Sequence, residues 1–199
     1  MLTTVNRKRG DDPLPFALAV LQRDGPSGLT MRNVANEAGV TATALYRHYP
    51  DKDALVKAVV KACYEAFRRH LITEVESGDP ITWLRIAADR FLRFSLDYPN
   101  YYRLLFEEPH GFGIDKYPDD FKRGKTPTFR QLRDLVKAAI ESGAFAGDPE
   151  KDAADIALTL YAHLHGLIML RLAGRFPDEA VFQRFYSQSV DRLFEGLKA

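Results

Sequence analysis

The segment GVTATALYRHYPDKDAL, residues 39–55, combines short side chains with polar groups that could bind a nucleic acid. The short side chains come first, and hydroxyl, guanidinium, imidazole and ammonium groups follow: Thr41, Ala42 and Thr43, then Tyr46, Arg47, His48 and Lys52. Threonine hydroxyls and methyl groups on a helix can contact base edges in a DNA major groove, which is about 12 Å wide. The hydroxyl, imidazole and ammonium groups near the helix end are suited to hold phosphates. These residue types predict non-covalent recognition of double-stranded DNA.

Two short helices, expected over residues 30–38 and 41–49, must position these side chains. Thr30 and Thr41 are candidate N-terminal caps, because their hydroxyl oxygens can accept hydrogen bonds from the first turn of each helix. Gly39 lies between the helices and can adopt the positive φ that a sharp turn requires. The pattern therefore predicts two helices joined by a tight turn.

The residues that face each other in this pair favour close packing. Ala35 is small enough for the helices to cross closely, and Val40 and Leu45 are expected to point inward. We interpret the pair as a helix-turn-helix. The alternative is an ordinary helical hairpin that does not bind DNA.

Helical periodicity runs along almost the whole chain, and no window shows the sustained alternation of a β-strand, so the sequence predicts an all-α fold of about nine helices. The expected ranges are 14–23, 30–38, 41–49, 52–73, 80–97, 99–107, 128–143, 150–173 and 178–197. Three prolines and three glycines interrupt residues 109–128, which we expect to hold either a short helical turn over 119–123 or a functional lid. We expect a helix-turn-helix domain over residues 1–60 and a helical body over residues 61–199.

The charge distribution supports a DNA-facing N-terminal part. Residues 1–72 hold 11 Lys and Arg against 7 Asp and Glu, a net charge of +4. Residues 73–199 hold 17 against 20, a net charge of −3. A mildly basic head on a mildly acidic body is consistent with binding to a polyanion.

Composition places the chain in the cytoplasm. No apolar segment stands near the N-terminus, and the longest mostly apolar run, residues 157–170, is expected to be too short and too polar to span a bilayer. The single cysteine, Cys63, cannot form an internal disulfide and lies in an apolar helical pattern. We therefore expect a core thiol and no membrane partner.

Motifs for catalysis or cofactor binding are missing from the sequence. It contains no glycine-rich phosphate loop, nucleophile elbow or metalloprotease helix. His163 and His165 are two residues apart, so on a helix they point about 200° away from each other and cannot chelate one ion together. We expect no enzyme activity, no cofactor and no metal site.

The body is rich in aromatic residues at helical spacing. Rings and imidazoles that could line an apolar pocket for a small hydrophobic ligand are Trp83, Phe91, Phe94, Tyr98, Tyr102, Phe106, His163 and His165. The alternative for each single ring is plain core packing. As a group, they predict a ligand-binding site in the body.

The last two helices, over 150–173 and 178–197, offer more apolar surface than one short body needs to bury. The residues concerned are Ile156, Leu160, Leu164, Leu167 and Leu170, then Val181, Phe182, Phe185, Val190 and Leu193. We infer a homodimer in which two helices from each subunit form a four-helix interface. Two heads about 34–36 Å apart would read an inverted repeat.

The stretch GLTMRNVANEAGVTATALYRHYPDKDALVKAVV resembles the N-terminal domain of the tetracycline-repressor (TetR) family of bacterial transcription regulators. The resemblance implies that Thr30 and Arg32 flank the DNA backbone at the start of the first helix of the pair. It places Thr41, Ala42, Thr43 and Arg47 in the groove, and it assigns phosphate contacts to Tyr46, His48 and Lys52. It also implies nine or ten helices, of which the last two pair with a second subunit.

Further along, YPNYYRLLFEEP and AHLHGLIMLRLAG resemble a C-terminal subgroup of this family that is marked by a Trp-His-Gly motif. Leu164 replaces the tryptophan of that motif here. The chain departs from the family at its start, where Pro13 and Pro15 predict a shortened first helix. The preceding basic residues 7–9 are either helical or a flexible arm that reaches the minor groove.

Together these features predict a ligand-responsive DNA-binding regulator. We expect a repressor that a small hydrophobic molecule releases from a palindromic operator. Residues 61–199 would then bind the ligand and form the dimer. The rival is an all-α binding or scaffold protein, or an unrecognised enzyme, whose helix-turn-helix is only structural.

Overall fold

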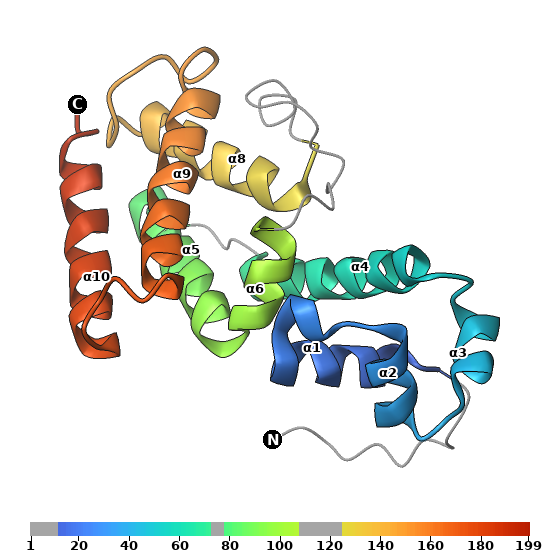
Figure 1. Cartoon of the computed structure of the whole chain (residues 1–199). Helices are drawn as coiled ribbons and strands as arrows, with labels where there is room; N and C mark the ends of the chain where they lie inside the picture. Colours follow the sequence, from blue (N-terminus) through green and yellow to red (C-terminus); the bar gives the residue numbers. More distant parts are fainter. Residues whose placement is uncertain (1–11, 73–77, 108–124) are drawn as a thin grey trace. The chain divides into compact units, whose positions relative to one another are not determined.

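The computed structural model describes residues 12–72, 78–107 and 125–199, and every regular element in these ranges is an α-helix (Figure 1). The nine helices of the described residues are α1 (Leu14–Gly28), α2 (Met31–Ala38), α3 (Ala42–His48), α4 (Lys52–Leu71), α5 (Pro80–Asp97), α6 (Pro99–Phe106), α8 (Pro127–Glu141), α9 (Ala153–Leu172) and α10 (Glu179–Glu195). The predicted all-α fold is confirmed. The basic residues 7–9 and the predicted lid up to residue 124 lie outside the described residues.

The helices form two compact units. Most of α4 belongs with α1, α2, α3 and α6 in the first unit, and the last turn of α4 belongs with α5, α8, α9 and α10 in the second. Helix α6 joins the first unit because it packs against α1. This division differs from the single boundary predicted at residue 60, since α4 leaves the first unit after Ala66 and the chain returns to it at Tyr98.

The core of the first unit is built from the apolar stripes of its helices. Leu21 of α1, Leu55 of α4 and Tyr102 of α6 are completely buried. Cys63 of α4 is also buried, and this burial raises the pKa of its thiol to about 12. The thiol is therefore protonated at neutral pH.

Helix α1 contains a break near its end. Its start is held by Asp12, whose Oδ1 accepts a hydrogen bond from the Leu14 amide at 3.0 Å. Gly25 has a φ of 72° and a ψ of −176°, which is not helical, and a short separate turn follows it up to Gly28. The regular part of the helix therefore stops at Gly25, which agrees with the predicted end near Arg23.

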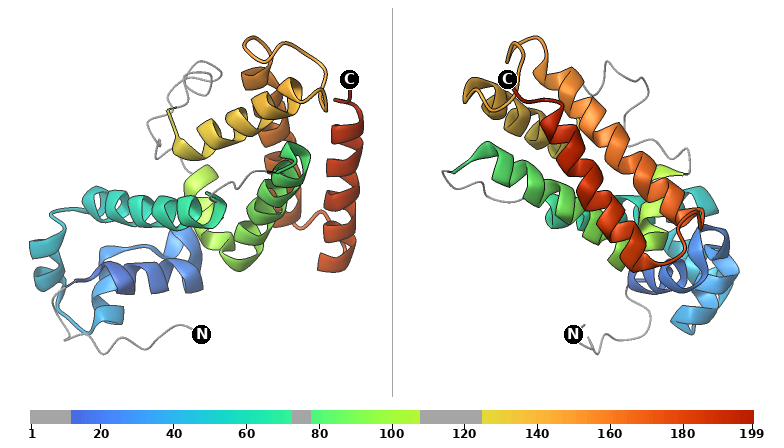
Figure 2. Two further views of the ribbon diagram at one scale, coloured as in Figure 1. Left: turned by 180° about the vertical axis from the view of Figure 1, so that it is seen from behind. Right: turned by 90° about the vertical axis from the view of Figure 1, so that its left-hand side faces the viewer.

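Helix α9 contacts the three other complete helices of the second unit, α5, α8 and α10. Helices α9 and α10 lie side by side (Figures 1 and 2). Helix α10 is fixed to α5 by Tyr186, whose hydroxyl donates a hydrogen bond to the Ala88 carbonyl at 2.9 Å. Asp191 of α10 also pairs with Arg85 of α5, whose guanidinium lies over the Phe194 ring.

Half of the residues predicted for the dimer interface are used inside the chain. Those with buried side chains are Leu160, Leu164, Leu167, Phe182 and Val190. The prediction that they are available to a partner is wrong, because the chain's own packing already covers them. Leu170 and Phe185 remain 49% and 42% exposed.

Helix α9 has the length and composition of a membrane-spanning helix. It contains 20 residues, and an 18-residue window within it has a mean hydropathy of 1.4. The expectation that its apolar run is too short and too polar is therefore wrong. Core helices of globular proteins have the same composition, and α9 packs against three helices. Only 28% of the window is buried within the chain, so much apolar surface on α9 remains uncovered.

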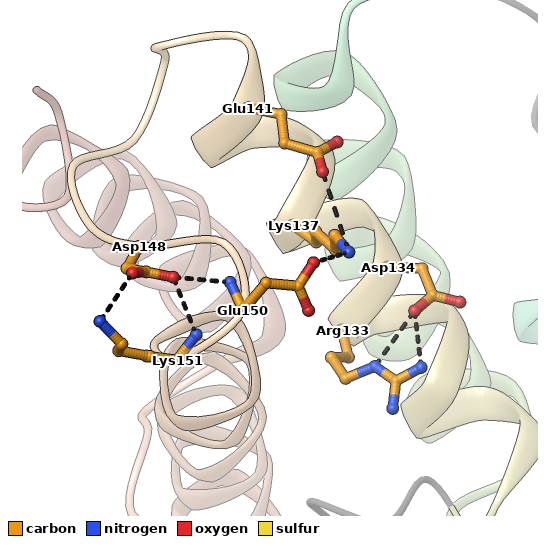
Figure 3. A network of polar contacts seen from close by, with 7 residues as sticks. All are labelled: Arg133, Asp134, Lys137, Glu141, Asp148, Glu150 and Lys151. Atoms are coloured by element: carbon orange, nitrogen blue, oxygen red, sulfur yellow. Dashed lines mark hydrogen bonds and ion pairs between the residues drawn. The ribbon is translucent and has the colours of Figure 1, made fainter.

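Ion pairs hold the turn between α8 and α9 (Figure 3). Lys137 of α8 pairs with Glu150 of the turn, and this contact raises the pKa of the Lys137 ammonium. Asp148 accepts hydrogen bonds from the amides of Glu150 and Lys151 at 2.9 and 3.2 Å. Because these side chains are largely exposed, the pairs order the turn more than they stabilise the unit.

Candidate nucleic-acid interface

Short-range hydrogen bonds define the ends of α2 and α3. The Thr30 Oγ1 accepts a hydrogen bond from the Asn33 amide at 3.1 Å, and the Thr41 Oγ1 accepts one from the Ala44 amide at 3.2 Å. Gly39 ends α2 in the left-handed conformation, with a φ of 66° and a ψ of 32°. Both caps and the glycine turn lie where the sequence predicts them.

The side chain amide of Asn33 adds a contact that sequence reasoning missed. Its Nδ2 donates a hydrogen bond to the Gly28 carbonyl at 2.8 Å, which fastens the first turn of α2 to the end of α1. The asparagine three residues after the threonine cap is the feature of the sequence that could have indicated this contact. The start of α2 is therefore held from both sides of Thr30.

Helix α3 is anchored by one face and exposed on the other. Leu45 is completely buried, and Ala35 and Val34 of the neighbouring α2 are buried as well. The predicted inward position of Leu45 agrees with this packing, while Val40 is half-buried. With only seven residues, α3 depends on this anchor more than on its own helical propensity.

The opposite face of α3 gathers the side chains for which DNA contacts are predicted. All of them are exposed: Thr41, Ala42, Thr43, Tyr46, Arg47 and His48. Tyr46 is 50% exposed, which is unusual for a large ring on a small helical unit. The face presents small groups first and a phenol, a guanidinium and an imidazole at its end.

Polar groups on either side of α3 extend this surface within the first unit. Arg32 on α2 and Lys52 at the start of α4 are both exposed, and Thr30 is half-buried. Asp51 caps α4, because its Oδ1 accepts a hydrogen bond from the Ala54 amide at 2.7 Å. A lysine on the first turn of a helix is well placed for an anion, since amide N–H groups point in the same direction.

Tyr49 links the end of α3 to the start of α1. It is half-buried, and burial together with the negative charge of Asp12 raises the pKa of its phenol. The phenol therefore stays neutral at physiological pH.

The residues predicted to line a ligand pocket fall into both units. Trp83, Phe91, Phe94, His163 and His165 lie in the second unit, and Tyr98, Tyr102 and Phe106 lie in the first. In the first unit, the Tyr102 and Phe106 rings are 4.6 Å apart between centroids, and Tyr102 is fully buried. These rings contribute to the core that joins α6 to α1.

In the second unit, five rings form a continuous row that we call the aromatic row: Phe94, Phe67, Phe91, Tyr161 and His165. Phe67 meets Phe94 and Phe91 edge to face, with centroids 5.0 and 6.0 Å apart. Tyr161 lies 6.0 Å from Phe91 and stacks on His165 at 5.6 Å. Sequence reasoning missed Phe67 and Tyr161, although Tyr161 precedes His165 by one helical turn.

Histidines in this unit have different surroundings. Burial lowers the pKa of His165, which favours its neutral form. His163 contacts Ser189 of α10, with 2.7 Å between Nε2 and Oγ, so it links α9 to α10. Within the described ranges, no three His, Cys, Asp or Glu side chains are grouped as a metal site would require.

Two family models match this chain, one over its N-terminal part and one over its C-terminal part. Residues 16–59 match the family model described as bacterial regulatory proteins, tetR family. Residues 84–195, more than half of the chain, match the model described as tetracyclin repressor-like, C-terminal domain. An uncharacterized HTH-type transcriptional regulator from Haemophilus influenzae is 32% identical over 88 residues, which cover 43% of this chain and 42% of that protein.

Solved structures share the fold over nearly the whole length. A protein of unknown function from Rhodococcus sp. RHA1 is 23% identical with a TM-score of 0.75, covering 100% of both chains. A single-residue variant of TetR from Acinetobacter baumannii AYE in complex with minocycline is 22% identical with a TM-score of 0.61, covering 92% of this chain and 93% of that one. BioQ with its double-stranded DNA operator is 19% identical with a TM-score of 0.58, covering 96% and 99%.

Proposed function

The chain belongs to the tetR family of bacterial regulatory proteins and is a DNA-binding transcriptional regulator rather than an enzyme, and we propose that it is a ligand-responsive repressor. In this proposal it acts in the cytoplasm, where a homodimer binds an inverted-repeat operator. A small hydrophobic molecule releases the dimer from the operator.

The observation that carries the proposal is the exposed face of α3. Its six predicted contact residues are exposed while Leu45 anchors the helix from behind. Thr41, Ala42 and Thr43 would enter the major groove, where short side chains allow the backbone to come close to base edges. Arg47 is long enough to reach a guanine edge beside them.

Phosphate contacts would then fix the register of the helix on the duplex. Tyr46 and His48 stand at the end of α3, and Lys52 begins α4. Together with Thr30 and Arg32 at the start of α2, they would hold the DNA backbone on both sides of the groove. Such contacts position the protein without reading the sequence.

Dimerisation would use the uncovered side of α9 together with α10. Exposed residues that are small or apolar recur along one side of α9, namely Thr159, Ala162, Gly166 and Leu170, and the exposed Ala173 follows directly after the helix. Phe185 of α10 is exposed as well. The mean hydropathy of α9 also supports a protein partner on this side, because an uncovered apolar helix is unfavourable in water.

Gly166 supports a second copy as that partner. Glycine within a helix costs about 1 kcal/mol relative to alanine. Beyond its own stretch of helix, a Cβ at this position would meet no atom of the described residues within 4 Å, so the packing of these residues does not require glycine. Close approach of a helix from the second subunit would require it.

The ligand would bind against the aromatic row in the second unit. Phe67 in this row belongs to the last turn of α4, so a ligand that displaced the row would act directly on α4. The rest of α4 belongs to the first unit, where it follows α3 directly in the chain. The minocycline complex of an Acinetobacter TetR supports a ligand site in this fold.

The coupling required is modest. A ligand that prefers the non-binding arrangement by ~1–3 kcal/mol lowers operator affinity about 5- to 150-fold. Titrating candidate hydrophobic molecules into the purified dimer–operator complex measures this directly. A ligand that binds and leaves operator affinity unchanged would disprove the allosteric part.

The decisive experiment is selection of bound fragments from sheared genomic DNA of the source organism. Recovery of a shared inverted repeat would establish operator binding, and the adjacent genes would indicate the ligand class. No enrichment at low and at moderate salt, with the dimer verified, would instead favour a protein whose helix-turn-helix is only structural.

A further inference from the structure

The carbonyl of Gln22 lies in the last regular turn of α1. Because the backbone of Gly25 is not helical, this oxygen is one of the final carbonyls of the helix, which have no donor four residues later within the helix. A side chain from a distant helix supplies the donor, because the Asn100 Nδ2 of α6 donates a hydrogen bond to the Gln22 carbonyl at 2.9 Å.

The kink in α1 is shaped to receive this side chain. Gly25 is buried and has a positive φ of 72°, which side chains other than glycine rarely tolerate. A Cβ on Gly25 would lie 3.4 Å from the Asn100 Oδ1. Glycine at position 25 therefore ends the regular helix at the point where the Asn100 side chain lies.

The residue that follows Gln22 connects this site to the helix-turn-helix. Arg23 reaches Glu37 on α2, with 2.7 Å between Nη1 and Oε2. Helices α1 and α2 also pack directly against each other, and α2 packs against α3. These contacts form a continuous path from the end of α1 through α2 to α3 inside the first unit.

Asn100 lies in the first turn of α6, and a single residue separates α6 from α5. The chain passes from the second unit to the first between Asp97 and Tyr98. We infer that Asn100 is a positioning residue for operator binding, which holds the end of α1 by donating to a terminal carbonyl that has no donor within the helix. This inference rests on the operator binding proposed above, and in it α6 fixes the orientation of α1 and, through α2, that of α3.

Loss of this bond should weaken operator binding without removing a DNA contact. Without this bond, α1 is no longer held in one orientation, and a smaller fraction of the molecules has the arrangement that binds the operator. The apparent operator affinity falls in proportion to that fraction. For Asn100→Ala we expect operator affinity about 5- to 10-fold weaker, the effect of one hydrogen bond. The slope of affinity against salt concentration should stay unchanged, because no phosphate contact is lost.

Two further variants separate positioning from helix stability. Asn100→Asp keeps the size of the side chain and favours the α6 N-terminus through its negative charge, but it cannot donate to the carbonyl. It should therefore melt no lower than the wild type and still bind the operator as weakly as Asn100→Ala. Gln22→Ala is the matched control, since it removes an exposed side chain, keeps the carbonyl and should bind like the wild type.

Wild-type operator affinity of Asn100→Ala or of Asn100→Asp would overturn the inference, and so would a loss for Gln22→Ala equal to that for Asn100→Ala. Failure of the wild-type chain to bind any operator would instead overturn the proposed function.

Discussion

Leu45 and Tyr46 are neighbours on α3, yet Leu45 is completely buried and Tyr46 is 50% exposed. Leu45 therefore holds α3 in place, whereas Tyr46 lies on the face that is available for binding. Leu45→Ala should leave a cavity and lower the free energy of unfolding by about 2–5 kcal/mol. Tyr46→Ala should change it by about 0.5 kcal/mol or less. Chemical unfolding of both variants measures the difference, and equal destabilisation would contradict the assigned faces.

Phosphate contacts predict a characteristic salt dependence. Tyr46→Ala and Lys52→Ala should weaken binding to all DNA sequences, and Lys52→Ala should reduce the salt slope by about 1 because one charged contact is lost. Fluorescence anisotropy at a series of salt concentrations provides both quantities. Lys198→Ala, at the far end of the chain, is the control for the loss of one exposed lysine. An unchanged salt slope for Lys52→Ala would show that Lys52 does not contact a phosphate.

Base recognition predicts a different response at Thr43. Thr43→Ala removes a hydroxyl from an exposed position on α3 and should weaken binding to the selected operator by about 1–3 kcal/mol. Binding to unrelated DNA should stay the same, because that binding depends on phosphates. Competition between the operator and a scrambled duplex compares the two. A uniform loss on both duplexes would place Thr43 on the DNA backbone.

Dimerisation can be tested at Gly166. Gly166→Leu should leave the subunit folded, because no other helix among the described residues comes within 4 Å of the added Cβ, and it should abolish the dimer. Analytical ultracentrifugation gives the oligomeric state. Glu141→Leu adds the same side chain at an exposed position of α8 and should remain dimeric. A Gly166→Leu variant that dimerises like the wild type would move the interface elsewhere.

Burial of His165 predicts a dependence of stability on pH. Its pKa is lowered in the folded protein, so the unfolded chain binds a proton more readily. The free energy of unfolding should be highest above the ordinary histidine pKa of about 6.5 and should fall as the pH drops below that value. His165→Asn should reduce this loss of stability at low pH, as measured by thermal unfolding between about pH 7.5 and about pH 5.5. His48→Asn, which removes an exposed imidazole, is the control.

Much of the fold could be predicted because its signals are local. The caps at Thr30 and Thr41 bind amides three residues away, and Gly39 makes its turn alone. Periodicity likewise located the helices to within a few residues. Gly25 likewise ends the regular part of α1 by its own backbone conformation, as predicted.

The sequence by itself determined the helices, their caps and the small and polar residues of α3, since these depend on neighbours within one or two turns. Only the tertiary structure decided which sides of α9 and α10 are covered, that α6 belongs with α1, and that Phe67 and Tyr161 complete the aromatic row. The physical reason is distance along the chain. Asn100 meets a carbonyl 78 residues away and Tyr186 one 98 residues away, and periodicity within a helix carries no information about which other helix will cover it.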